Sequence, residues 1–316
     1  MIMVRVLLIF ALVMNASAAG INLTYLTYHK TAFETKSLIA HRGASGYAPE
    51  HTSASYKLAI AQGANFVEPD LQISRDGVLV CLHDSTLERT TNVAEIFPDR
   101  FKLQGTVKHW NVSDFTLQEL KTLDAGSWFD PRFKGEKILS FQEMIDLVKN
   151  KAGIYPETKS PDTYGRLGFD MEKLVLATLR KNHLDTPGAN PKTPVIIQSF
   201  SPESLRKLRF ELKTRLPLVL LVSSVAEKQW LSPEGLKAAH EFANGVGPDK
   251  KLVDGKPELV QAAHKLGLTV TLYTVNEKGR GRFKSIAEEM SYYLYDLGVD
   301  ALFTDNPDKF PRQKIN

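Results

Sequence analysis

The chain has 316 residues, of which 43% are hydrophobic and 24% charged, and its formal net charge is +4. These values are ordinary for a globular protein with a large core, arranged as one large domain or two smaller ones. The mild charge is not gathered in a long basic block, so it indicates neither a nucleic-acid partner nor a strongly anionic membrane. The single cysteine, Cys81, excludes an internal disulfide. Within the apolar run VLVCLHD it is expected to be a buried thiol rather than a nucleophile.

The first residues have the layout of a secretory signal peptide. Arg5 precedes an apolar run at 6–14, and small residues follow at 16–19. This pattern predicts a signal peptide over 1–19, with cleavage near Ala18 or Ala19. The run is far shorter than the roughly 20 apolar residues that span a bilayer. We therefore expect a periplasmic or secreted protein with no stable membrane span.

Eight strand-like segments follow, with helix-like segments between them. The strand candidates are SLIAHRG (37–43), FVEPDLQI (66–73), GIYPETK (153–159), PVIIQSF (194–200), LPLVLLVS (216–223), NGVGP (244–248), LTVTLYTVN (268–276) and DALFTDNP (300–307). Most are continuous apolar runs, which is typical of parallel strands covered by helices. Helices are predicted after Thr52 and from Ser140, Ser201, Ser232 and Pro257.

This alternation favours an α/β fold, a (β/α)8 TIM barrel over 37–312, and the chain length suits a barrel with an insertion. An open, doubly wound sheet is the alternative. No G-x-G-x-x-G follows the first strand, which disfavours a dinucleotide-binding version of that sheet. Between 85 and 137 the pattern becomes irregular and partly aromatic. We interpret this stretch as a small subdomain inserted after the second barrel strand.

Polar residues recur at the carboxyl ends of the predicted strands, where the active sites of TIM barrels lie. They are His41 and Arg42, Glu68 and Asp70, Glu157 and Lys159, Gln198 and Ser199, Tyr273 and Asn276, and Asp305 and Asn306. A hairpin return after Asp76-Gly77 adds His83. Any one of these can be a structural polar group, but their coincidence across six strand ends indicates an active site.

Glu68 and Asp70 are two residues apart on one strand, so their side chains are expected on the same face. Two adjacent carboxylates repel each other unless a cation lies between them. Glu157 ends the next barrel strand and can complete an oxygen-rich site for one divalent cation, Ca²⁺ or Mg²⁺. Zinc is disfavoured because no closely spaced Cys or His pair accompanies them. The alternative is a pair of ion-paired surface carboxylates.

Arg42 and Lys159 add positive charge beside the predicted cation. A metal, an arginine and a lysine together predict a phosphate-binding site. His41 and His83 can then act as general acid and general base, in either order, because imidazole titrates near working pH. Asp84 is expected to orient His83 or to cap its loop. The set predicts phosphodiester cleavage without a covalent serine or cysteine.

These motifs resemble the glycerophosphodiester phosphodiesterase family, and within it the periplasmic bacterial branch. The similar segments are HRGASGYAPEHT (41–52), EPDLQISRDGVLVCLHD (68–84), YPETK (155–159), QSF (198–200), LYTVN (272–276) and FTDNP (303–307), in the family's order. The resemblance implies a TIM barrel with an inserted subdomain and a divalent cation. It also implies hydrolysis of glycerophosphodiesters, such as glycerophosphocholine or glycerophosphoethanolamine, to glycerol 3-phosphate and an alcohol.

Residue by residue, the resemblance implies roles for the strand-end positions. It implies His41 and His83 as the acid/base pair, Arg42 and Lys159 at the phosphate, and Glu68, Asp70 and Glu157 as metal ligands. Tyr273 stands where an aromatic residue lines the glycerol side, and Gln198 is also expected to line the substrate. His51 replaces the Asn of many members, and we leave it out of the ligand set.

Two alternative functions follow from the same residues. A lysophospholipase D or a phosphatidylinositol phospholipase C-like barrel would need an apolar rim, which Trp110, Phe115, Trp128 and Phe129 could provide. A non-catalytic surface binding protein on a decayed barrel would have lost strand-end residues, and none is missing here. The expected partner is a small-molecule substrate; the cation, the alcohol, the nucleophile and the oligomeric state are left open.

Overall fold

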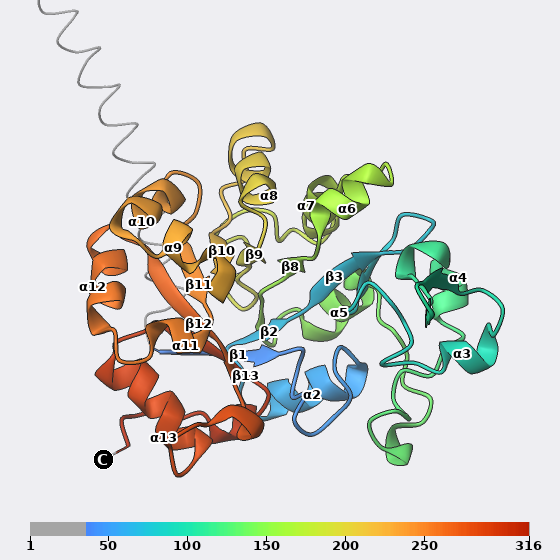
Figure 1. The fold of residues 1–316 in the computed structure, drawn as a ribbon, viewed down its shortest axis with the longest axis horizontal. Helices are drawn as coiled ribbons and strands as arrows, with labels where there is room; N and C mark the ends of the chain where they lie inside the picture. The colour runs from blue at the N-terminus through green and yellow to red at the C-terminus, as the bar shows by residue number, and fades with distance from the viewer. Residues whose placement is uncertain (1–35, 316) are drawn as a thin grey trace, which may run out of the picture.

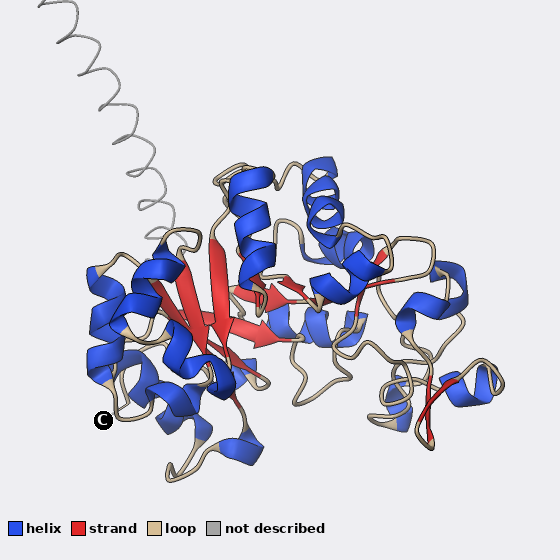
Figure 2. Ribbon diagram, turned by 45° about the horizontal axis from the view of Figure 1, so that its top comes forward, coloured by secondary structure: helices blue, strands red, loops and turns tan. Residues whose placement is uncertain are grey.

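The computed structural model describes residues 36–315, so the predicted signal peptide lies outside the described residues. Within this range, eight parallel strands surround a central core and helices cover their outer side (Figures 1 and 2). The strands are β1 (Ser37–His41), β2 (Phe66–Glu68) continued by β3 (Asp70–Ile73), β7 (Gly153–Ile154) continued by β8 (Glu157–Thr158), β9 (Ile197–Ser199), β10 (Leu218–Val222), β11 (Gly245–Pro248), β12 (Thr269–Val275) and β13 (Ala301–Thr304).

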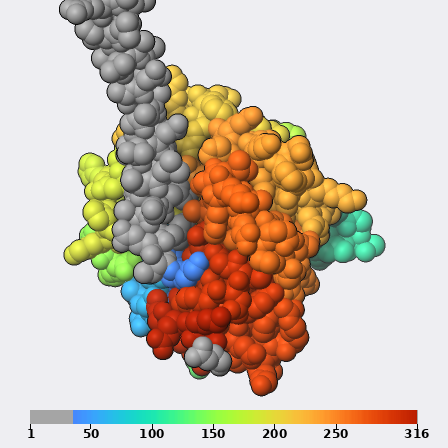
Figure 3. All heavy atoms as spheres, turned by 90° about the vertical axis from the view of Figure 1, so that its left-hand side faces the viewer, coloured from blue at the N-terminus to red at the C-terminus, as the bar shows by residue number. Residues whose placement is uncertain are grey.

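The strand pairing closes the sheet on itself. β1 pairs in parallel with β2 on one side and with β13 on the other. Parallel pairs then lead from β3 to β8, β9, β10, β11, β12 and back to β13. The predicted (β/α)8 barrel is therefore confirmed, and the open sheet is wrong. Figure 3 shows the blue of the first strand directly against the red of the C-terminal segment, as the β1–β13 pairing requires.

Two of the eight strands are interrupted by a proline between their two halves. Pro69 separates β2 from β3, and Pro156 lies just before β8. Proline has no N–H to give to a sheet, but its carbonyl still accepts. Glu157 donates its N–H to Pro69 O at 2.9 Å, and Gln198 donates to Pro156 O at 2.9 Å. The register therefore continues past both prolines.

The predicted helices are present, and several more are found. The helices around the barrel are α2 (Ser53–Ala61), α5 (Phe141–Val148), α6 (Pro161–Arg166), α7 (Met171–Lys181), α8 (Pro202–Arg206), α9 (Glu227–Trp230), α10 (Pro233–His240), α11 (Lys250–Val253), α12 (Pro257–Lys265) and α13 (Ile286–Ser291). The hydroxyls of Ser201 and Ser232 accept the N–H groups of Ser204 and Gly235 and cap both helices, which therefore begin where the sequence predicts. Helices α6, α7, α9, α11 and α13 were not predicted from the sequence.

The barrel interior explains why the polar residues gather at one end. Its apolar cluster contains Ile39, Phe66, Tyr155, Ile196, Val219, Ala301 and Phe303. Side chains two residues apart on a strand share a face, so each of the first four lies one layer below a polar residue. The residues above them are His41, Glu68, Glu157 and Gln198. The packed layer thus forms the floor on which the polar layer stands.

The segment after β3 leaves the barrel. A turn with Gly77 at φ +80° leads into β4 (Leu79–Cys81), which runs antiparallel to β3. Residues 85–137 then contain α3 (Val93–Ile96), β5 (Lys102–Gln104), β6 (Val107–His109) and α4 (Leu117–Leu120). These helices lie at the right of Figure 1, across the molecule from α10 and α12.

This segment has its own buried cluster, which includes Leu87, Trp110, Phe115 and Leu120 and continues into Val80 of β4. The boundaries of the subdomain at 85 and 137 stay a prediction. Among residues 36–315, no helix is long and apolar enough to cross a membrane.

Candidate active site

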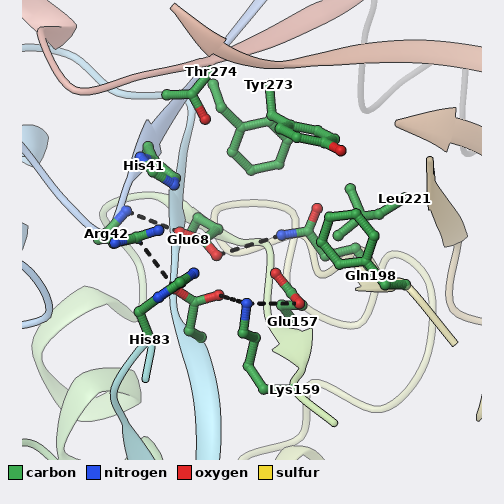
Figure 4. Close-up of a pocket in the computed structure, with 13 residues that line it drawn as sticks. His41, Arg42, Glu68, His83, Glu157, Lys159, Gln198, Leu221, Tyr273 and Thr274 are labelled. Atoms are coloured by element: carbon green, nitrogen blue, oxygen red, sulfur yellow. Dashed lines mark hydrogen bonds and ion pairs between the residues drawn. The ribbon is translucent and has the colours of Figure 1, made fainter. Parts of the chain in front are cut away.

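A cavity of about 160 Å³ opens at the carboxyl ends of the barrel strands (Figure 4). It is lined by all nine residues that the sequence predicted for the site: His41, Arg42, Glu68, Asp70, His83, Glu157, Lys159, Gln198 and Tyr273. The lining also contains four residues that were not predicted, Phe200, Leu221, Thr274 and Phe303. Segments between 41 and 303 in the sequence therefore meet in one pocket.

Three carboxylates form one wall of this cavity. One oxygen each from Glu68, Asp70 and Glu157 lies within 4.8 Å of the others, and all three residues are buried. Burial, with Asp70 and Glu157 beside it, raises the pKa of Glu68 well above its usual range. Burial and the neighbouring Asp70 raise the pKa of Glu157 to about 8. Two of the three carboxyls therefore favour the protonated form at neutral pH unless a cation joins them.

Asp70 behaves in the opposite way because cations and donors surround it. Burial opposes ionisation, but Lys159, His51 and Arg42 outweigh it and hold the pKa of Asp70 well below its usual range. Lys159 Nζ lies 3.6 Å from Asp70 Oδ1 and 3.2 Å from Glu157 Oε1. Asp70 is therefore the carboxylate that stays ionised in the cluster.

His51 supports Asp70 from outside the cavity. Its Nε2 lies 3.0 Å from Asp70 Oδ2, and its Nδ1 lies 2.8 Å from the hydroxyl of Tyr56. A carboxylate only accepts, so Nε2 carries the proton and Nδ1 accepts from Tyr56. His51 does not line the cavity and is not in the carboxylate cluster.

Arg42 lies beside the carboxylates with its backbone in the left-handed region, at φ 56°. Its N–H donates to Glu68 Oε2 at 2.9 Å, and its Nε lies 3.3 Å from Asp70 Oδ2. That Nε nevertheless makes no hydrogen bond to any residue of the described range 36–315. A buried guanidinium N–H at the cavity wall is thus available to a bound anion.

The carboxylate cluster fits a hard divalent cation, which prefers oxygen ligands. Beyond the three carboxylates, the amide oxygen of the buried Gln198 also lacks a hydrogen-bond partner within residues 36–315. The Gln198 amide nitrogen lies 3.5 Å from Glu68 Oε1. Glu68, Asp70 and Glu157 are therefore the residues that would hold the cation.

Each histidine of the cavity is paired with an aspartate. His41 Nδ1 lies 2.7 Å from Asp305 Oδ1, and His83 Nδ1 lies 2.6 Å from Asp84 Oδ1. Burial opposes ionisation of Asp305, but the hydrogen bond from His41 lowers its pKa. In the same way, burial opposes ionisation of Asp84, but hydrogen bonds from Arg89 and His83 lower its pKa. Each ionised carboxylate accepts from Nδ1, so Nε2 is the nitrogen available for proton transfer. Burial lowers the pKa of His83 to about 4, so its neutral form is the resting one.

Several residues of the site were missed or only partly read from the sequence. Asp305 was noted only as a polar strand end, and its pairing with His41 follows from the β13–β1 contact. Glu50 belongs to the first motif, but nothing in the pattern pairs it with Arg89, which is 39 residues further along. Phe200 is an exposed ring directly after β9 and forms an edge contact with Tyr273. Strand-end position was the one signal that could have pointed to Phe200.

Among the four aromatic residues proposed for an apolar rim, Trp110 and Phe115 are buried in the cluster of the inserted segment. Trp128 is exposed and Phe129 is partly exposed. The rim expected for a lipid-binding barrel is therefore reduced to at most two of its four residues.

The closed barrel, with its polar layer of carboxylates, cations and histidine–aspartate pairs, defines a TIM-barrel phosphoric diester hydrolase. The Glycerophosphoryl diester phosphodiesterase family model matches residues 41–309. The chain belongs to this family and is a glycerophosphodiester phosphodiesterase.

Known relatives agree over nearly the whole chain. A glycerophosphodiester phosphodiesterase of Bacillus subtilis is 38% identical, covering 87% of this chain and 85% of that protein. A solved glycerophosphodiester phosphodiesterase of Agrobacterium tumefaciens is similar with a TM-score of 0.66 and 28% identity, covering 87% and 99% of the two chains. A phosphodiesterase of Oleispira antarctica, solved with the product sn-glycerol-3-phosphate, has a TM-score of 0.66 and 26% identity, covering 86% and 94%.

Proposed function

We propose that this protein hydrolyses glycerophosphodiesters, such as glycerophosphocholine or glycerophosphoethanolamine, to glycerol 3-phosphate and the alcohol. In this proposal the reaction depends on one divalent cation and on acid/base catalysis by His41 and His83. The observation that carries this proposal is that the carboxylate cluster, the cationic side chains of Arg42 and Lys159, and two histidine–aspartate pairs lie in one cavity. The product bound to the Oleispira antarctica relative supports the choice of substrate.

The cation, when bound, would supply positive charge that neutralises the phosphate and stabilises charge developing in the transition state. Arg42 and Lys159 would bind phosphate oxygens from the same side as the carboxylate cluster. One imidazole would take a proton from the attacking hydroxyl or water through Nε2, and the other would protonate the departing alcohol. Asp84 and Asp305 would keep both rings oriented throughout by accepting from Nδ1.

The size of the cavity favours a small substrate. Its volume of about 160 Å³ is below the roughly 300–1,000 Å³ of sites that enclose drug-sized ligands. Gln198 and the ring of Tyr273 would line the substrate. The Tyr273 hydroxyl donates to Val222 O at 3.0 Å, which holds the ring in place.

A direct test measures release of choline from glycerophosphocholine by the mature chain, before and after chelation and with Ca²⁺ or Mg²⁺ restored. We expect activity to fall on chelation and to return with one of the cations. His41→Ala and His83→Ala should each lower kcat by roughly 100- to 10,000-fold. Full activity in the chelated enzyme would remove the metal from the proposal, and full activity in His83→Ala would remove the catalytic assignment.

Two alternatives are decided by the same preparation. A lysophospholipase D would release choline faster from lysophosphatidylcholine than from glycerophosphocholine. A surface binding protein would hydrolyse neither substrate.

We further propose that the chain is secreted or periplasmic after signal-peptide cleavage. Mass spectrometry of the exported protein should show an N-terminus near residue 19 or 20; an uncleaved Met1 would contradict it.

A further inference from the structure

Arg89 lies just outside the cavity and belongs to the inserted segment, not to the barrel. It is absent from the cavity lining, and its side chain is 42% exposed. Its neighbour Leu87 is fully buried in the cluster of the inserted segment, and the Leu87 N–H donates to Trp110 O at 2.9 Å. Glu88 accepts from His109 Nδ1 at 2.7 Å. The backbone just before Arg89 is thus held by the inserted segment at both Leu87 and Glu88.

The guanidinium of Arg89 contacts two acidic residues from different parts of the site. Its NH1 and NH2 donate to Glu50 Oε2 and Oε1 at 3.0 and 2.7 Å. Its Nε donates to Asp84 Oδ2 in a short contact. One planar group therefore uses its fork on Glu50 and its remaining edge on Asp84, a geometry that only arginine offers.

Each of these carboxylates also holds a residue of the cavity. The second oxygen of Asp84 accepts from His83 Nδ1 at 2.6 Å. Glu50 Oε1 also accepts from Arg42 NH1 at 3.2 Å. Burial opposes ionisation of Glu50, but Arg89 and Arg42 lower its pKa to about 2. Glu50 therefore stays an anion between two guanidinium groups. Arg89 is therefore linked to His83 through Asp84 and to Arg42 through Glu50.

We propose that Arg89 is a positioning residue through which the inserted segment holds His83 and Arg42 in their working orientations. This inference rests on the proposed function, because it takes the roles of His83 and Arg42 from it. Without Arg89, Asp84 loses one of its two fixed partners and can turn with the His83 ring. Glu50 then has Arg42 as its sole cationic partner in this network, and the Arg42 guanidinium is drawn toward it.

The test compares Arg89→Gln and Arg89→Lys with the wild type on glycerophosphocholine at saturating cation. We expect Arg89→Gln to lower kcat by roughly 10- to 100-fold, the usual effect of losing a residue that orients a catalytic group. Arg89→Lys should recover only part of this loss, because an ammonium cannot bind Glu50 with a fork and reach Asp84 as well. KM should change less than kcat.

Arg100→Gln is the matched control. Arg100 lies in the same inserted segment and makes a similar set of contacts, to Glu119 Oε1 at 2.6 Å and Asp114 O at 2.7 Å, but none to Glu50 or Asp84. It should lower the melting temperature and leave kcat and KM unchanged. If Arg89→Gln behaved like Arg100→Gln, Arg89 would be structural and the proposal would be wrong.

Two double-mutant cycles trace the path. If Arg89 acts through Asp84, then adding Arg89→Gln to Asp84→Asn should cost much less in kcat than it costs alone. The cycle with Glu50→Gln tests the Arg42 branch in the same way. Losses that multiply in both cycles would overturn the inference.

The wild type and His83→Ala, measured in the same assay, distinguish a failure of the proposed function from a failure of the positioning role. A wild type that leaves glycerophosphocholine intact means that the proposed function fails, and an active His83→Ala means that the catalytic role proposed for His83 fails. An inactive His83→Ala together with a fully active Arg89→Gln means that the positioning role alone fails.

Discussion

Cation uptake by the carboxylate cluster should release protons and strengthen as the pH rises. The oxygens of Glu68, Asp70 and Glu157 lie within 4.8 Å of one another. Two unit charges at that distance repel by at least about 3.5 kcal/mol at an effective dielectric constant of ~20. Three ionised carboxylates without a cation are therefore strongly disfavoured. Burial, together with this repulsion, raises the pKa of Glu68 well above its usual range and that of Glu157 to about 8.

The sign of the pH effect follows from competition. A protonated carboxyl cannot ligate a cation, so each bound proton must leave when the cation enters. With a pKa of about 8, Glu157 is about nine-tenths protonated at pH 7. The apparent affinity should therefore rise by roughly tenfold between pH 6 and 7, and by about fivefold between pH 7 and 8, from Glu157 alone. Above pH 8 this part of the dependence should level off.

The assay is calorimetric titration of the chelated protein with Ca²⁺ or Mg²⁺, repeated in buffers of different ionisation enthalpy to count released protons. Bound cation at one hundred times its Kd adds about 2.7 kcal/mol to the free energy of unfolding. For a domain of this class that raises Tm by roughly 5–10 °C.

Glu157→Gln should bind more weakly and release fewer protons. Glu172→Gln is the matched control, because Glu172 is also a buried carboxylate with a lysine partner, Lys207, but is absent from the cavity lining. Cation binding that is independent of pH, or unchanged in Glu157→Gln, would refute the reasoning.

Three further predictions concern residues outside the carboxylate cluster. Lys250 and Glu289 form a buried ion pair at 2.6 Å. Lys250→Met should lower the free energy of unfolding, measured in urea, by about 3 kcal/mol. This is the low end of the ~3–5 kcal/mol for breaking a buried pair, because Glu289 can take up a proton. The double variant Lys250→Met with Glu289→Met should recover part of that loss, and an equal loss in the single and double variants would contradict the prediction. Burial opposes ionisation of Asp124, but the N–H groups of Ser127, Gly126 and Gly135 donate to it and lower its pKa to about 2, below its unfolded value. Its contribution is thus present above pH ~4 and lost as the pH falls toward 2, so Asp124→Asn should flatten that part of the Tm–pH curve, and an unchanged curve would count against it. Burial raises the pKa of the Cys81 thiol, so a thiol reagent should label it only after denaturation, and rapid labelling of the native chain would contradict this.

Much of the fold was readable from the sequence because parallel barrel strands leave a simple pattern. A strand covered on both faces is a continuous apolar run, which most of the eight predicted segments were, and all eight segments coincide with barrel strands. The helices predicted from Ser201 and Ser232 were also found, because their capping contacts are local. Helices α6 and α7 were missed; α6 follows Ser160 in a left-handed conformation, which no local cap marks.

The sequence by itself determined the family, the barrel and the nine residues that line the cavity. It could do so because these depend on strand periodicity and on motifs that lie within a few residues of each strand end. The pairing of His41 with Asp305, the support of Asp70 by His51, and the bridge from Arg89 to Glu50 and Asp84 were decided only by the tertiary structure. Such contacts join side chains from separate loops, across sequence distances of up to 264 residues, and no periodicity relates them. The physical reason is that a closed barrel brings every carboxyl strand end to one rim, and only the closed ring determines which of the side chains there are neighbours.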